Sequence, residues 1–284
     1  MCVGVPLGAP LFLWLTIMLE FALSGLRSGL RGKSFQAVFI LGVLMIGIAY
    51  LSGLFSPRQP QTVALDVGFS GIRFSLVLLN LFWVQELVAR EIDRRVILFS
   101  LAYPVSRGAF LAGRFVAILI LSTLAATVLG LLLLLAVVMV GGGYSQEFEL
   151  ALGVPFWSAV AGFAIDAAVV AAFALCVAAL STVAVLPLAL GAAFAVAGKA
   201  LGATIAYLSQ GADGDEELVA SYDPAIELVK WLVPDLSRLD WREWAMYQLP
   251  PGAGEVTWAV VMAVAYIVLL LVCASLLFAR REFS

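Results

Sequence analysis

The chain has 284 residues, of which 63% are hydrophobic and 12% charged, with a net charge of −3 and a mean hydropathy of +1.08. A soluble domain is nearer to about 25% charged, so this composition predicts an integral membrane protein. The chain has no histidine, no GxxxxGK[ST] phosphate loop and no HExxH or GxSxG motif. We therefore expect no enzyme activity, cofactor or metal in this chain itself, and no nucleic-acid partner.

The first predicted element is an amphipathic helix over residues 11–33. Its polar positions recur every three or four residues, at Thr16, Glu20, Ser24, Arg27 and Arg31. No basic region precedes Leu11 and no small-residue cleavage site follows, so we interpret the segment as retained and not as a cleaved signal. It is expected to lie along a membrane surface, either as a simple anchor or with a specific mechanical role.

Six later segments are long and apolar enough to cross a bilayer. They cover residues 35–55, 69–88, 108–140, 155–180, 182–208 and 256–278. The sequence thus predicts a single all-α, polytopic membrane domain over residues 1–284. The third segment would be about 50 Å long, more than the ~30 Å hydrocarbon core, so it should tilt or project and place Arg114 near the headgroups.

The distribution of basic residues predicts the orientation. An even number of spans places both termini on one side, and ten of the 16 lysines and arginines then flank that side, against five on the other. Because basic residues favour the inside, both termini are expected in the cytoplasm.

Residues 209–254 form the one long segment outside the predicted spans, on the extracytoplasmic side. The aromatic residues of this segment from position 231 onward alternate with charged ones, which is typical of side chains at the headgroup level. They are Trp231, Trp241, Trp244 and Tyr247. A docking surface for an outside partner or substrate is the alternative interpretation.

Asp166 and Lys199 are the two ionisable residues well inside predicted spans. If spans four and five form a hairpin near Leu180, the helical rise places the two residues about 22 and 27 Å from the turn. A structural Asp166–Lys199 ion pair is the favoured interpretation, and a substrate or ion path lined by both is the alternative. Pro187, Gly191, Gly198 and Gly202 fit either close helix packing, which we favour, or a hinge.

The segment 89–107 joins the second and third spans on the cytoplasmic side. The acid-first spacing of Glu86 with Arg90, and of Glu91 with Arg95, predicts that the second span continues as a charged helix. Val96–Ala102 is too short to cross a bilayer, and Pro104 makes a rigid turn before Ser106, which could cap the next helix.

Here the chain resembles the type-2 ATP-binding-cassette transporter permeases. Members carry a stretch similar to "REIDRRVILFSLAYPVSRGAFLAGR", residues 90–114, although Arg95–Leu98 stand where the family usually has Gly-Thr-Leu-Glu. The resemblance extends to the N-terminal helix, to "LVPDLSRLDWREWAMYQLP" and to the "FARREF" ending. The chain is most similar to the permeases related to nitrous-oxide-reductase maturation.

The resemblance implies a homodimer or pseudo-dimer of permeases in the inner membrane of a bacterial cell, with each copy docked on a separate cytoplasmic ATPase that binds ATP and Mg²⁺. The segment 89–107 would then couple ATPase closure to the membrane helices. The residues expected to do so are Glu86, Arg90, Glu91, Asp93, Arg94, Tyr103, Pro104 and Arg107. The function expected is export of a substrate or transmission of force; the alternative is a scaffold or signalling subunit that docks a cytoplasmic partner without transport.

Overall fold

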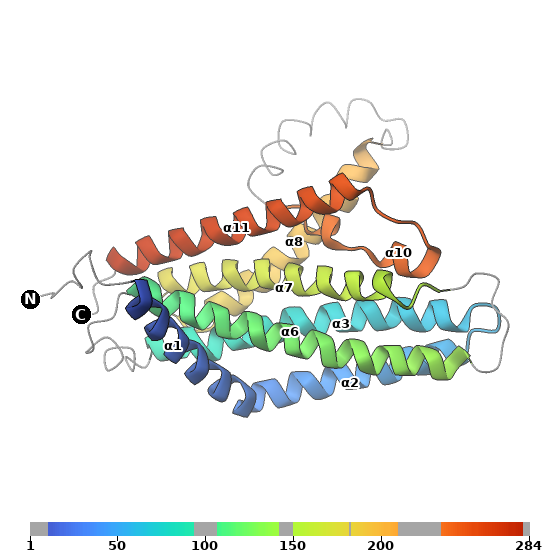
Figure 1. Ribbon diagram of the computed structural model, residues 1–284, viewed down its shortest axis with the longest axis horizontal. Coiled ribbons are helices and arrows are strands. Elements are labelled where there is room, and N and C mark those ends of the chain that lie inside the picture. The colour runs from blue at the N-terminus through green and yellow to red at the C-terminus, as the bar shows by residue number, and fades with distance from the viewer. Residues whose placement is uncertain (1–10, 94–106, 142–149, 182, 210–233, 281–284) are drawn as a thin grey trace, which may run out of the picture.

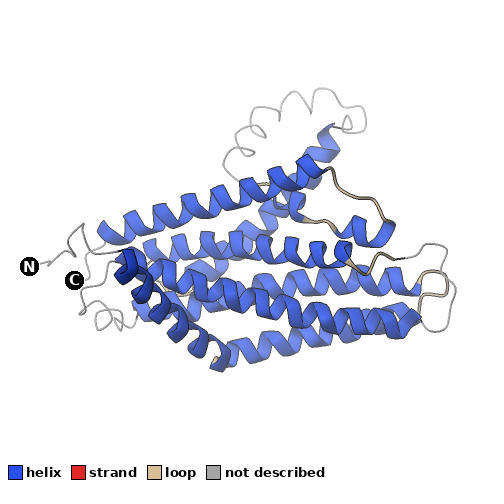
Figure 2. Cartoon of the chain, viewed as in Figure 1, coloured by secondary structure: helices blue, strands red, loops and turns tan. Residues whose placement is uncertain are grey.

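The computed structural model describes residues 11–93, 107–141, 150–181, 183–209 and 234–280. Within these ranges every regular element is a helix, and the long helices form one bundle (Figures 1 and 2). Arg94, Tyr103 and Pro104 of the predicted coupling segment lie outside the described residues.

Five helices are long and apolar enough to cross a membrane, by length and composition. They belong to α2 (Lys33–Leu54), to α3 (Pro60–Val84) with its extension, to α6 (Arg107–Val140), to α7 (Val154–Leu180) and to α11 (Ala253–Arg280). The chain therefore has the architecture of a polytopic helical membrane protein. Apolar residues on all sides of these helices are what a membrane environment requires.

The predicted fifth span corresponds to α8 (Leu186–Ser209), in which the apolar stretch of described residues covers Leu186–Gly202. Pro187 is the second residue of α8, where a proline is tolerated because the first turn has no intrahelical acceptor to lose. It therefore starts the helix and introduces no hinge within it.

The helix α3 begins at Pro60, nine residues before the predicted start of the second span, and Pro60 occupies its first turn. It continues without a break through η1, a π-helix over Gln85–Ala89, into α4 (Arg90–Asp93). At ~1.5 Å per residue this run is about 50 Å long. The predicted charged continuation of the second span is thus present, as a helix.

The N-terminal helix α1 (Leu11–Arg31) is also present, and it packs beside the first half of α6. Phe21 packs edge-on against Phe110, with 5.4 Å between ring centroids, and Gly25 lies against Ala117. The chain turns at Gly32, whose extended backbone separates α1 from α2, so that the two helices meet at an angle (Figure 1).

The start of α1 and the end of α11 lie at one end of the bundle, which we call the basal end, and the opposite end is the distal end (Figure 1). The end of α4 and the start of α6 are also basal. The core lies between α3 and α7, where the rings of Phe69, Phe156 and Phe163 pack with centroids 5.3 and 5.5 Å apart. α2 and α11 lie at opposite sides of this core (Figure 1).

Candidate functional site

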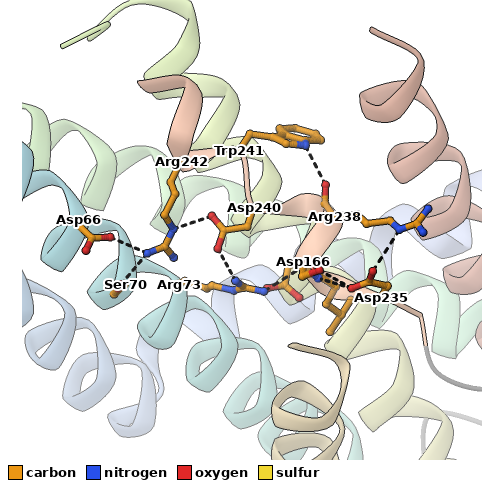
Figure 3. Close-up of polar contacts among 11 residues, drawn as sticks. Asp66, Ser70, Arg73, Asp166, Asp235, Arg238, Asp240, Trp241 and Arg242 are labelled. Atoms are coloured by element: carbon orange, nitrogen blue, oxygen red, sulfur yellow. Dashed lines mark hydrogen bonds and ion pairs between the residues drawn. The ribbon is translucent and has the colours of Figure 1, made fainter. Parts of the chain in front are cut away.

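The described part of the chain holds a cluster of five charged side chains, which we call the charge cluster and which Figure 3 shows. Its centre is Arg73 of α3, whose side chain is only 8% exposed. Arg73 donates from Nε to Asp166 of α7 at 2.6 Å and from Nη1 to Asp240 at 2.9 Å. Its Nη2 donates to the carbonyl oxygen of Leu236 at 3.4 Å. A buried guanidinium is stable only when its donors are satisfied in this way.

Arg242 completes the cluster from the start of α10 (Arg242–Tyr247). It donates from Nε to Asp240 at 2.8 Å, and from Nη1 to Asp66 at 2.9 Å and to the hydroxyl of Ser70 at 3.1 Å. Burial disfavours the charged guanidinium, but the hydrogen bonds and charges of Asp240 and Asp66 outweigh it and raise the pKa of Arg242. Arg242 therefore keeps its charge at every physiological pH.

Asp240 connects the two arginines. One carboxylate oxygen of Asp240 accepts from Arg73 and the other from Arg242, so the two cations share one bridging anion. The ring of Phe163 lies near both guanidinium groups, 6.0 Å from Arg73 and 5.8 Å from Arg242. The cluster thus contains three acids and two bases, joined across α3, α7 and the segment 234–247.

Local structure places Asp240 at this position. Asp235 caps η4, a 3-10 helix over Leu236–Leu239, by accepting from the backbone nitrogen of Ser237 at 3.1 Å and from its hydroxyl at 2.6 Å. A Cβ on Gly162 would collide with the carbonyl oxygen of Leu239, so only glycine lets this part of α7 approach so closely.

The glycines of α8 serve the same packing. A Cβ on Gly198 would lie 2.7 Å from the side chain of Leu236, and one on Gly202 would collide with Ser237. Gly191 packs against Leu81 of α3. Close helix packing, the favoured interpretation of these glycines, agrees with these contacts, which join α8 to α3 and to the 234–247 segment.

The predicted pair between Asp166 and Lys199 is wrong. Asp166 pairs with Arg73, and the ion pairs between described residues include none to Lys199, whose side chain is exposed on α8. The prediction considered only the hairpin of spans four and five, whereas the actual partner comes from α3, 93 residues away in sequence. Arg73 lies inside the predicted second span, residues 69–88, and a charge at that position itself calls for a buried partner.

The aromatic residues predicted at the headgroup level differ in their exposure, and Trp244 is half-buried. Trp241 is buried and its Nε1 donates to the carbonyl oxygen of Arg238 at 3.0 Å, so it packs within the protein and is no headgroup anchor. Tyr247 is 50% exposed, as a headgroup anchor would be. Trp231 lies outside the described residues. Ala151 donates to the carbonyl oxygen of Ala245 at 3.0 Å, which ties the segment to the start of α7.

A second ion pair lies at the basal end, between Glu91 of α4 and Arg114 of α6. Arg114 donates from Nη2 to Glu91 at 2.7 Å and from Nη1 to Ser24 of α1 at 3.3 Å. Its guanidinium lies 5.5 Å from the Phe110 ring centroid, and its side chain is 7% exposed. Arg114 therefore lies inside the protein and joins three helices.

Burial raises the pKa of the Glu91 carboxyl, because the loss of water outweighs the opposing charge and hydrogen bond of Arg114. Arg95, the predicted partner of Glu91, lies outside the described residues, so the Glu91–Arg95 pair stays a prediction.

The other predicted pair, Glu86 with Arg90, is not formed. Glu86 lies in the π-helix, where hydrogen bonds run from residue i to i+5, so side chains four apart no longer share one face. Arg90 is exposed. Asp93 ends α4 and Arg107 begins α6, and the side chains of both lie outside the described ones.

Among the described residues no group of three or more Cys, Asp or Glu side chains could hold a metal ion. What the folded chain defines, at the level of class, is a polytopic helical membrane protein with a buried charge cluster. A comparison with protein-family models finds no match, and neither does a comparison with curated proteins.

Proposed function

We propose that the chain is the permease subunit of an ATP-binding-cassette transporter, which couples ATP hydrolysis by a separate cytoplasmic ATPase to export of a substrate or to transmission of force. The observation that carries the proposal is the ion pair between Glu91 and Arg114. It joins α4 to α6, the two helices between which residues 94–106 lie. A push on that segment would thus reach α3 and α6 together.

The continuity of α3, η1 and α4 supports the same proposal. The run extends from Pro60 to Asp93, so its basal end is joined by one helical rod to Arg73 in the charge cluster. Charged groups would set the orientation of the ATPase on the basal end, and the apolar residues of Val96–Ala102 would supply buried area.

In this proposal α8 also crosses the membrane, which brings the number of spans to six. The basal end faces the cytoplasm of a bacterial cell, and α1 lies at the inner membrane surface. The apolar residues exposed on α2 and α11, among them Leu44 and Val268, offer faces for lipid or for a second permease copy. The 234–247 segment would face the periplasm, where a further partner could dock.

The second candidate function is a scaffold or signalling subunit that binds a cytoplasmic partner without transport. The charge cluster favours it, because each of its charged groups has an opposite partner, although Nη2 of Arg242 is buried without a hydrogen-bond partner, and such a network holds helices in one arrangement. A permease must change its helix packing during each cycle, so the two functions differ in whether ATPase turnover responds to the chain.

The experiment reconstitutes the full chain in lipid nanodiscs with the ATPase encoded by an adjacent reading frame that contains a phosphate loop. We expect copurification and stimulated ATP turnover. Reversing two basal charges, Arg90→Glu with Asp93→Lys, should lower both by about tenfold or more, because charges at an interface set orientation and affinity. Glu91 is left unchanged, since its replacement would also break the pair with Arg114.

The matched control reverses two charges away from the basal end, Arg58→Glu with Glu243→Lys, both of which are exposed. Copurification and turnover should match those of the unmodified chain. If no such ATPase copurifies with the chain or changes its turnover in the presence of the chain, the permease proposal fails. A cytoplasmic partner that binds while ATP turnover stays unchanged would favour the scaffold.

A further inference from the structure

A pocket of about 520 Å³ opens between the second half of α1 and the π-helix η1. Its lining is entirely polar or glycine and comes from α1, the α1–α2 turn and η1. The residues are Ser24, Arg27, Ser28, Arg31, Gly32 and Glu86. The volume falls in the ~300–1,000 Å³ range of small-ligand sites.

The pocket has charges of both signs that are not paired with one another. Arg27 and Arg31 stand one helical turn apart on α1, and both are exposed. On the opposite wall, Oε2 of Glu86 is buried and has no hydrogen-bond partner. None of the ion pairs between described residues involves these three side chains. An anion would stabilise the two arginines, and a cation would stabilise the carboxylate of Glu86.

The position of Glu86 is fixed by the turn between α1 and α2. Its carboxylate lies over Gly32, where an added Cβ would be 2.6 Å from Oε2 and 2.9 Å from Oε1. Gly32 is the N-cap of α2, and no side chain caps that helix. A partial positive charge at the start of a helix favours a carboxylate there. Glu86 is thus held at the pocket wall by the π-helix and by the absence of a side chain at residue 32.

The pocket lies where the apolar part of α2 begins. The candidate span starts at Phe35, three residues after Gly32. Phe35 stacks on Trp83 with 5.7 Å between ring centroids, and Trp83 donates from Nε1 to the carbonyl oxygen of Gly29 at 3.3 Å. Trp83 is only 1% exposed, so these two rings pack inside the protein, and the start of the apolar span at Phe35 is what indicates the headgroup level. Beyond them α2 exposes Ile40 and Leu44.

A ligand that fits these features carries an anion and a hydrogen-bonding cation a few bonds apart, and has an apolar part that can follow α2. We propose that the pocket binds the headgroup of an aminophospholipid of the phosphatidylethanolamine class. The phosphate pairs with Arg27 and Arg31 and accepts from the hydroxyl of Ser28. The primary ammonium donates to Glu86.

Other occupants satisfy only part of the pocket. Phosphatidylglycerol pairs with the arginines but brings no cation to Glu86. A choline headgroup has a cation without N–H donors. A soluble phosphate leaves both Glu86 and the adjoining apolar face of α2 unused. The inference depends on the pocket lying at a membrane boundary and not on the proposed transport function.

The test is native mass spectrometry of the delipidated full chain, titrated with phosphatidylethanolamine, phosphatidylglycerol and phosphatidylcholine that have the same acyl chains. We expect phosphatidylethanolamine to bind most tightly. Glu86→Gln should weaken phosphatidylethanolamine by about tenfold, the loss of a charge-assisted hydrogen bond, while phosphatidylglycerol binds as before or more tightly. Arg27→Gln with Arg31→Gln should weaken both lipids. Because the three lipids are compared on the same purified variant, a lower yield of that variant cannot by itself change the order in which they bind.

The controls are Glu20→Gln and Arg58→Gln. Glu20 is an exposed acid on α1 outside the pocket, and Arg58 is an exposed base in the chain between α2 and α3. Neither should change the order of the lipids. Equal binding of phosphatidylethanolamine and phosphatidylcholine overturns the proposal, as does an unchanged preference in Glu86→Gln. Preferred binding of phosphatidylglycerol, or displacement of lipid by inorganic phosphate, assigns the pocket to another ligand and also overturns it.

Discussion

Arg73 of α3 and Asp166 of α7 form an ion pair at 2.6 Å with side chains that are 8% and 3% exposed, the most buried of the ion pairs between described residues. Both residues lie within candidate spans. A charge in that position is stable only when an opposite charge and further hydrogen bonds accompany it, and here Asp240 and the carbonyl oxygen of Leu236 supply them.

Removing one member of this pair should therefore be costly. Asp166→Leu leaves the Nε of Arg73 buried without its anion, and we expect a loss of about 3 kcal/mol in the free energy of unfolding. Arg73→Met added to Asp166→Leu should recover part of the loss, because no unpaired charge is then left between α3 and α7. Reversible unfolding in mixed detergent micelles measures both values.

Lys199→Met is the matched control, because Lys199 is the partner that the sequence favoured and its side chain is exposed. It should change the free energy of unfolding by no more than about 0.5 kcal/mol. A loss comparable to that of Asp166→Leu would instead mean that Lys199 carries the pairing.

Arg242 and Arg238 lie four residues apart and should differ in their effect on stability. Arg242 is 18% exposed and bonds to two aspartates. Arg238 is 53% exposed and, among the described residues, pairs with Asp235 alone, three residues before it. Arg242→Gln should cost about 1.5 to 3 kcal/mol through its charge-assisted hydrogen bonds, and Arg238→Gln less than about 1 kcal/mol.

The same unfolding measurement compares these two substitutions, with proteolysis of the 234–247 segment as a second readout. Arg242→Gln should make that segment more sensitive to protease, because Arg242 joins it to Asp66 and Ser70 of α3. Equal effects of the two substitutions would show that the charge cluster contributes no more to stability than an exposed ion pair.

Gly162 provides a test of the close approach between α7 and the chain before α10. Gly162→Ala should destabilise by about 1 to 3 kcal/mol, because a Cβ meets the backbone carbonyl of Leu239, which cannot rotate away as a side chain could. Gly47→Ala in α2 is the control, since no atom lies within 4 Å of a Cβ there. It should be neutral or stabilise by up to about 1 kcal/mol through helix propensity. Circular dichroism during thermal unfolding of both variants compares the two.

The helices of this bundle could be predicted from the sequence because a long apolar run needs no information from other parts of the chain. Residues 108–140 were predicted as one span, and α6 covers Arg107–Val140. The partner of Asp166 could not be predicted in that way, because the register between α3 and α7 depends on the packing of side chains such as Phe69 and Phe163. Helix spacing within one hairpin favoured Lys199 instead.

The contacts at the basal end show a second limit on what can be predicted from the sequence. A four-residue spacing predicts an ion pair only if the helix keeps its α geometry, and the π-helix at Gln85–Ala89 turns Glu86 toward Gly32 instead of toward Arg90. No pattern of residue types in the sequence predicts that change from α-helix to π-helix. The partner of Glu91 likewise lies 23 residues ahead in α6, beyond the reach of local spacing.

Glu91 makes the stability of the basal end depend on pH in a direction opposite to that of most ion pairs. Burial raises its pKa above the ordinary value of 4.5, and the charge and hydrogen bond of Arg114 lower it only in part. In the window between 4.5 and the raised pKa, the folded chain binds more protons than the unfolded chain. The contribution of Glu91 is therefore fully present below 4.5 and is lost as the pH rises through the folded pKa.

The measurement compares the free energy of unfolding of the unmodified chain and of Glu91→Gln between about pH 4 and about pH 8, the range over which a raised carboxyl titrates. The difference between the two should decline as the pH rises, because glutamine keeps the shape of Glu91 without its titration. Arg114→Met should make the decline steeper, since the two effects that lower the pKa of Glu91 are then gone. A difference that grows with pH would instead mean that the attraction of Arg114 exceeds the cost of burial, and the Glu91–Arg114 pair would then be an ordinary stabilising ion pair.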